Sequence, residues 1–201
     1  ILNPFKFKIY AKTIGPKLKA KDKIIEIENI QTQISLLSII NNEFSLEDLE
    51  ASTKTIEIKN LVSFLRQFYN TPQLYILEKF IKRGHLIADI KVYFDKEGKI
   101  KNNFKVKGLI KDSQVGITKN YNIEKINLIF DLDNESLKAQ DITFKFNDLN
   151  FSSEKVFVKK NKEQFIIDGQ VRNKNFELDK KKLSFFLKNN FPNLEINKLK
   201  F

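Results

Sequence analysis

The sequence predicts a mainly β fold with a few helices: a long, antiparallel, twisted sheet that forms an open apolar groove, with one helical interlude near residues 60–84. Hydrophobic residues alternate with polar ones along much of the 201-residue chain. Alternation at period two places successive side chains on opposite faces of a strand. Turn residues separate these segments at intervals of about 8–15 residues, as in an antiparallel meander.

Residues 1–59 are expected to form strands and one short helical turn. Alternation is clear at Phe5–Ile9, Ile25–Glu28 and Ile56–Lys59. The segment Ser35–Asn41 breaks the alternation, and its first residue suits the N-cap of a helix. We therefore predict a short helix there, between strands.

Residues 60–84 are predicted to form amphipathic helices. Asn60–Tyr69 offers a possible cap at its first residue and apolar side chains at helical spacing. Thr71–Gly84 is the clearest helix: Thr71 suits the N-cap, the following Pro72 suits the first turn, and Gly84 suits the end. Two helices are expected to interrupt the strands here.

An antiparallel meander is predicted over 85–178. Its turns are expected at Asp95–Gly98, Lys111–Ser113 and Asp133–Glu135, where Asp, Asn, Gly and Lys gather. The lone His85 is placed where the preceding helix meets the first strand.

Residues 179–201 are predicted to form a C-terminal helix, Asp179–Asn190, and a tail. Pro192 would stop that helix. No Pro-, Gly- or Ser-rich linker divides the chain, so 1–201 is treated as a single β-rich segment of a larger protein.

The composition argues against enzyme chemistry. Cysteine is absent and His85 is the only histidine, so thiolate metal sites, disulfides and common nucleophile–base triads are excluded or disfavoured. No phosphate-binding or nucleophile-elbow motif occurs. Asp131 and Asp133 form a carboxylate pair, but they lie at a predicted turn that favours Asp for backbone reasons. We expect no catalytic residue, no metal site and no cofactor.

The net charge of +11 does not by itself predict nucleic-acid binding. Arg66, Arg83 and Arg172 are the only arginines among 36 basic residues, whereas arginine is the preferred reader of phosphates and base edges. Lysines on outer strand faces protect a sheet from edge pairing. We expect no nucleic-acid partner, with attraction to anionic lipid headgroups as a subsidiary role.

The inward apolar row is the candidate functional feature. It has two interpretations: the core of a closed sandwich or helix-covered sheet, or an open groove that receives acyl chains. Each buried methylene would contribute about 0.8 kcal/mol, and alternation alone does not separate the two. The candidate groove residues are Ile25, Ile27, Ile56, Ile58, Ile90, Val92, Phe94, Phe104, Val106, Leu128, Phe130, Ile142, Phe144 and Phe146.

A resemblance favours the groove. The segments Ile14–Leu18, Ile25–Ile30, Ile34–Ile40, Phe44–Leu49 and Ile56–Leu61 resemble the N-terminal region of the AsmA-like family of bacterial envelope proteins. The strand–turn–strand layers from Gly84 to Ile100 and from Val106 to Asp112 are similar to layers of the same superfamily, which includes TamB and YhdP. The resemblance covers most of the chain and is strongest over 13–66.

The resemblance implies a periplasmic, β-rich body in a Gram-negative envelope, anchored to the inner membrane by a segment absent from this chain. It implies a hydrophobic groove that carries phospholipid toward the outer membrane, without catalytic residues. The chain opens at Ile1 and not at Met, and no run approaches the roughly 18 apolar residues of a spanning helix, so a fragment is expected. The alternative is a structural module for outer-membrane biogenesis that pairs its sheet edges with an envelope protein.

Overall fold

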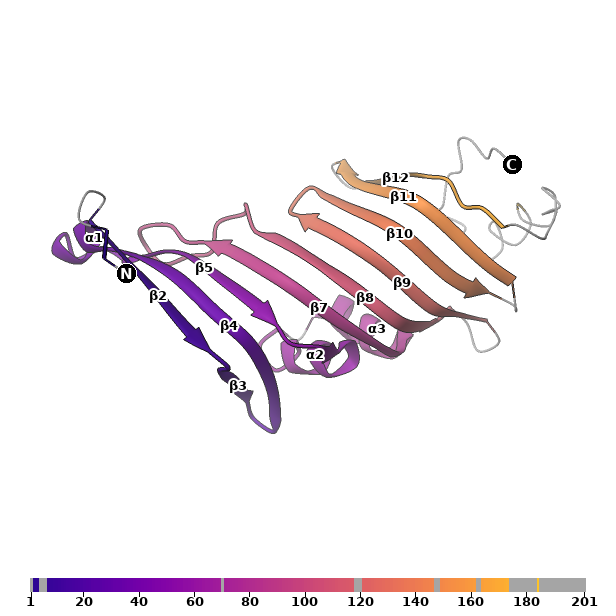
Figure 1. Cartoon of the computed structure of the whole chain (residues 1–201), viewed down its shortest axis with the longest axis horizontal. Helices are drawn as coiled ribbons and strands as arrows, with labels where there is room; N and C mark the ends of the chain where they lie inside the picture. The colour runs from indigo at the N-terminus through magenta and orange to yellow at the C-terminus, as the bar shows by residue number, and fades with distance from the viewer. Residues whose placement is uncertain are drawn as a thin grey trace.

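A single open antiparallel sheet dominates the molecule and confirms the predicted fold class. The computed structural model describes residues 2–3, 7–69, 71–117, 121–146, 149–161, 164–173 and 184. In these residues, twelve strands form one sheet, with three short helices. Figure 1 shows the sheet running along the length of the molecule, with the two longer helices beneath its middle.

The strands follow one another across the sheet almost in chain order. They are β1 (Leu2–Asn3), β2 (Lys8–Ile14), β3 (Lys17–Ala20), β4 (Lys23–Ser35), β5 (Leu46–Thr53), β6 (Ile56–Glu57), β7 (Ile81–Tyr93), β8 (Lys105–Gly116), β9 (Asn122–Asp133), β10 (Ser136–Phe146), β11 (Leu149–Asn161) and β12 (Gln164–Gly169). The spatial order is β1-β2-β4-β5-β7-β8-β9-β10-β11-β12, while β3 pairs with β4 and β6 with β7. This meander is the one that the turn spacing predicts.

Helix α1 (Leu36–Ile40) confirms the short helix predicted between strands. The backbone N–H of Ser38 donates to Ser35 Oγ at 3.2 Å, so Ser35 is the N-cap as expected. None of the five residues of α1 is buried. The helix therefore projects into solvent at the C-terminal end of strand β4.

Helices α2 (Ile58–Leu65) and α3 (Pro72–Phe80) differ from the prediction at their ends. Thr71 caps α3 as expected, accepting from the N–H of Leu74 at 3.4 Å. However, α2 begins at Ile58 and not at Asn60, and α3 ends at Phe80, so that Gly84 and His85 lie within β7. Burial explains both shifts.

The start of α2 and the end of α3 are fixed by a small buried cluster, which alternation alone does not reveal. Ile58 and Ile81, the first residues of α2 and β7, pack together with Val62. A second cluster joins α2 to the β3–β4 hairpin, where Phe64 packs with Ala20 and Ile25. Tertiary burial thus overrides the local cap and stop signals.

Aligned β-bulges cross the sheet at one level. Asp112 in β8, Lys125 in β9 and Asp141 in β10 have φ of 49°, 50° and 50°, and the strand registers shift beside each of them. Gly84 in β7, with φ of 137°, lies beside Ser113 at the same level. A bulge adds one residue to a strand and bends it. The turn predicted at Lys111–Ser113 is therefore wrong, because β8 continues through a bulge.

The other two predicted turns are confirmed. Asp95 Oδ1 accepts from the N–H groups of Glu97 and Lys99, both at 2.9 Å. Asp133 Oδ1 accepts from the N–H groups of Glu135 and Ser136, both at 2.8 Å. These backbone hydrogen bonds lower the pKa of each Asp carboxyl below its usual value. The helix predicted at Asp179–Asn190 lies outside the described residues, apart from Ser184.

Candidate functional site

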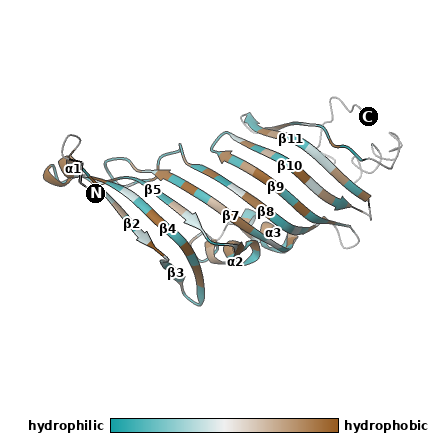
Figure 2. Ribbon diagram, in the orientation of Figure 1, coloured by the Kyte–Doolittle hydropathy of each residue, from teal (hydrophilic) through white to brown (hydrophobic). Residues whose placement is uncertain are grey.

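The register brings apolar side chains from many strands onto one face of the sheet. Directly paired residues of neighbouring strands point to the same side. One such row crosses six strands and consists of Ile90, Val106, Leu132, Leu137, Val158 and Ile167. Figure 2 shows the resulting bands of hydrophobic and hydrophilic residues alternating along the long strands.

Beyond the bulges, a second group of apolar residues lies on the same face. Leu86 and Ile110 pack against the buried cluster of Ile58, Val62 and Ile81. The register between β7 and β8 shifts twice between Ile81 and His85, so Ile81 and Leu86 share a face although they are an odd number of positions apart. Val115 pairs with Ile81 and Ile123, and Phe146 with Ile123 and Leu149. The rings of Phe144 and Phe151 stack at 5.1 Å.

We call this side the apolar face. It comprises the following residues of β7 to β12: Ile90, Val92, Val106, Gly108, Ile110, Val115, Ile123, Leu128, Phe130, Leu132, Leu137, Ala139, Ile142, Phe144, Phe146, Leu149, Phe151, Val156, Val158, Phe165 and Ile167.

The apolar face is covered only in part. Helix α2 packs over β4, β6 and β7, and α3 packs over β7. In the part of the chain that the structure describes, no helix or second sheet packs over β9 to β12. At the β12 edge, Phe165 is 68% and Ile167 is 60% exposed. Most other members are half-buried, by their neighbours within the face.

A cross-strand pair of Gly108 and Phe130 lies near the middle of the apolar face. A Cβ built on Gly108 would lie 2.9 Å from the Phe130 ring and 2.5 Å from the Ile87 carbonyl oxygen. The ring therefore lies over the glycine. Because Gly108 has no side chain, the Phe130 ring can lie close to the β8 backbone and does not project far from the apolar face.

Eight of the fourteen predicted groove residues lie on the apolar face: Ile90, Val92, Val106, Leu128, Phe130, Ile142, Phe144 and Phe146. Ile25, Ile27 and Ile56 are buried with Phe64 beneath α2, where the space is already filled.

The other three predicted residues lie outside the strands to which they were assigned. Ile58 is the first residue of α2 and is buried with Val62. Phe94 follows β7 and contacts the Phe44 ring at a centroid distance of 5.4 Å. Phe104 immediately precedes β8 and is half-buried.

The fourteen predicted residues omit thirteen members of the apolar face, among them Leu137, Leu149 and Phe151. Their signal was a change from odd to even apolar positions within a strand. In β10 the apolar residues occupy odd positions as far as Ala139 and even positions from Ile142 onward. This change in parity marks the bulge at Asp141.

The opposite face carries several cross-strand ion pairs, and we call it the polar face. Lys91 Nζ lies 3.3 Å from Asp48 Oδ2 and also pairs with Glu50, and Lys107 Nζ lies 3.2 Å from Asp131 Oδ2. The hydrogen bond to Glu50, with Asp48 beside it, raises the pKa of the Lys91 ammonium. These pairs link neighbouring strands but contribute little stability where they are exposed.

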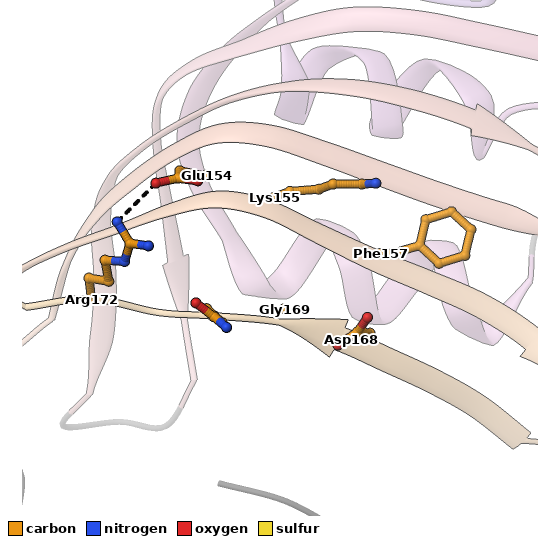
Figure 3. Close-up of a pocket in the computed structure, with 7 residues that line it drawn as sticks. Glu154, Lys155, Phe157, Asp168, Gly169 and Arg172 are labelled. Atoms are coloured by element: carbon orange, nitrogen blue, oxygen red, sulfur yellow. Dashed lines mark hydrogen bonds and ion pairs between the residues drawn. The ribbon is translucent and has the colours of Figure 1, made fainter. Parts of the chain in front are cut away.

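Two shallow hollows lie among the charged side chains, and neither forms a catalytic constellation. Figure 3 shows the first, of about 400 Å³, between β11 and the end of β12. There Arg172 Nη1 donates to Glu154 Oε1 at 2.9 Å, beside Phe157 and Asp168. The second, of about 390 Å³, lies among Glu50, Lys91 and Lys107. Acids and bases in both hollows are open to solvent or already paired.

Within the described ranges, no group of three or more His, Cys, Asp or Glu residues is placed to hold a metal ion. No helix in those ranges is long and apolar enough to span a bilayer. A scan against protein-family models found no match for this chain. Searches of curated proteins and of solved structures found no similar protein.

Proposed function

We propose that the protein binds phospholipid, with acyl chains lying along the apolar face and headgroups in water. One observation carries the proposal: apolar side chains from β7 to β12 share one face, and no described element packs over β9 to β12. Soluble proteins seldom leave such a large apolar surface without an occupant. The polar face, with its ion pairs, would stay in water.

The energy of such binding is of a useful size. Each buried methylene contributes about 0.8 kcal/mol, so ten carbons would contribute about 8 kcal/mol before the costs of association. The long rows of Phe, Ile, Leu and Val offer no fixed polar contacts. The face would therefore select for acyl chains in general and leave a chain free to slide along it.

The wider context belongs to the same proposal. A long, open antiparallel sheet supports the AsmA-like resemblance, and with it a periplasmic location and lipid movement between the inner and outer membranes. The same proposal includes attachment of the protein to the inner membrane. No part of the proposed role needs a catalytic residue.

The test compares two neighbouring substitutions on opposite faces. Phe130 lies on the apolar face, and Ile129 points to the polar face, where its side chain is 47% exposed. The 201-residue chain would be purified gently and examined by native mass spectrometry for bound phospholipid. We expect lipid on the parent protein and on Ile129→Asp, and at least a tenfold loss on Phe130→Asp.

Circular dichroism and a urea melt would establish that both variants are folded. Phe144→Asp serves as a second variant if Phe130→Asp does not fold. A folded apolar-face variant that retains its lipid contradicts the proposal. So does a well-folded parent protein that carries no lipid and acquires none from phosphatidylglycerol vesicles.

The second candidate is a structural module that acts through a sheet edge. Strand β12 is the last strand of the described sheet, and all six of its residues are exposed. An exposed strand edge can pair with an extended segment of another protein. A folded but lipid-free parent protein that pairs through β12 with an envelope protein would favour this function.

A further inference from the structure

Helix α3 is apolar on the side that faces solvent as well as on the side that faces the core. Leu74 packs against the Ile58 cluster, whereas Ile76 and Phe80, on the opposite side of the helix, are 52% and 41% exposed. No residue of α3 is buried. A surface helix normally places charged and polar residues on its outer side. An apolar outer side indicates a second contact.

The exposed apolar surface continues into the segment that joins α2 to α3. Phe68 is 60% and Tyr69 is 62% exposed, beside the 44% and 45% exposed Tyr75 and Leu77 of α3. We define the helical patch as Phe68, Tyr69, Tyr75, Ile76, Leu77 and Phe80. Exposed clusters of large apolar side chains mark sites of contact with proteins or membranes.

The charges around the helical patch are positive. Lys79 Nζ lies 4.6 Å from the centre of the Tyr75 ring, and Lys82 follows α3 at its end. The one carboxylate of α3, Glu78, is turned toward α2, where Ser63 and Arg66 donate to it and lower its pKa. Glu78 therefore stays ionised with its charge paired to Arg66, and the lysines set the remaining local charge.

The β3–β4 hairpin next to α2 carries four lysines against three acidic residues between Lys17 and Ser35. Its strands pack on α2 through Ala20 and Ile25, which contact Phe64. Lys19 and Lys21 are exposed near its tip, and within the described residues neither makes an ion pair. In Figure 1, the β3–β4 hairpin and the two helices lie along the same lower side of the sheet.

We infer that the helical patch docks on the surface of a bilayer that contains anionic phospholipid. Aromatic and aliphatic side chains from an interfacial helix enter the boundary between headgroups and acyl chains, while flanking lysines meet the phosphates. Lysines near an anionic membrane surface are attracted to its negative potential. Protein interfaces are instead depleted in lysine and enriched in arginine. The lysines that flank the helical patch therefore favour a membrane over a protein partner.

The position of the patch gives this docking a consequence. Helices α2 and α3 cover the apolar face over β7, and the uncovered part begins beside them. Docking brings that part of the apolar face close to the bilayer. The inference does not depend on the proposed lipid binding, and the two can fail separately.

The experiment is co-sedimentation of the full chain with vesicles. One set contains phosphatidylcholine alone, and the other contains equal parts of phosphatidylcholine and phosphatidylglycerol. We expect at least tenfold stronger binding to the anionic vesicles. The double variants Ile76→Ser/Phe80→Ser and Lys79→Glu/Lys82→Glu should each lose at least tenfold.

The matched control is Ile39→Ser/Ile40→Ser on α1. These residues are 50% and 73% exposed, and α1 carries no basic residue in its last turn. This control and Phe130→Asp should both sediment with anionic vesicles as the parent protein does. Native mass spectrometry reports the apolar face separately.

Several outcomes would overturn the inference. Equal binding to both vesicle types removes the role of the lysines, and an equal loss in the α1 control removes the role of the helical patch. A loss in folded Phe130→Asp would assign vesicle binding to the apolar face. A parent dimer that becomes monomeric in Ile76→Ser/Phe80→Ser, without vesicle binding, would make the patch a contact between two copies.

Discussion

Single residues decide whether the apolar face is smooth. Gly108 is the position in β8 where a side chain would collide both with the Phe130 ring and with the backbone at Ile87. The far end of a flexible side chain could move, but a carbonyl oxygen at 2.5 Å can move only with its strand. The glycine is required by contacts and not by φ, since its φ is not among the positive ones.

Gly108→Val is therefore expected to destabilise the protein by about 1–3 kcal/mol, in the range of an overpacked core site. Urea unfolding followed by circular dichroism would measure the change. The neighbouring Lys107→Val, on the polar face, removes an exposed ion pair with Asp131 and is expected to change stability by less than about 1 kcal/mol. Equal effects of the two substitutions would contradict the placement of Phe130 over Gly108.

At the scale of the element, the aligned bulges keep the apolar residues of each strand on one face. In β8, Ile110 and Val115 are an odd number of positions apart, and they share a face only because Asp112 occupies the bulge. The side chain of Asn127 joins three strands at this level. It accepts from the N–H of Asp112 at 3.0 Å and donates to Lys125 O at 2.9 Å and to Thr143 Oγ1 at 3.3 Å.

Lys125 tests the bulges, because its φ of 50° is unfavourable for a side chain and most unfavourable for a β-branched one. We expect Lys125→Val to destabilise the protein by about 1–2 kcal/mol, and Lys125→Gly to be neutral or stabilising by up to about 1 kcal/mol. Urea midpoints would give both values. A strand without a bulge would reverse the order, because valine favours strands and glycine does not.

The same bulges mark the limit of prediction from this sequence. Alternation predicted the meander, the turns at Asp95 and Asp133, and eight apolar-face residues, because each depends on neighbours in the chain. The strand through Asp112 was missed, because an Asp between Lys and Ser has the composition of a turn as well as of a bulge. The start of α2 at Ile58 depends on contacts with Ile81, 23 positions away, which no local pattern contains.

The part of the molecule that the structure describes is a sheet with little interior. Of the described residues, eleven apolar ones are buried, and no side chain is less than 2% exposed. Stability therefore depends on the backbone ladder and on two small clusters around α2, more than on one central core.

The small amount of buried apolar surface has a calorimetric consequence. The heat capacity of unfolding rises with the apolar surface that becomes exposed, and a compact domain of 201 residues would give about 2.4–3 kcal/mol/K. The isolated, lipid-free protein already exposes much of that surface when folded. We therefore expect a value well below that range, measured from the dependence of the unfolding enthalpy on the transition temperature at several pH values.

Sedimentation velocity on the same sample makes the result decisive. A monomer with a low heat capacity of unfolding has an apolar face that is open in solution. A monomer with the value of a compact domain would mean that the sheet closes on itself and buries the face, which contradicts the open arrangement. A dimer with a high value would place two copies face to face, and the apolar surface would then be satisfied by protein and not by lipid.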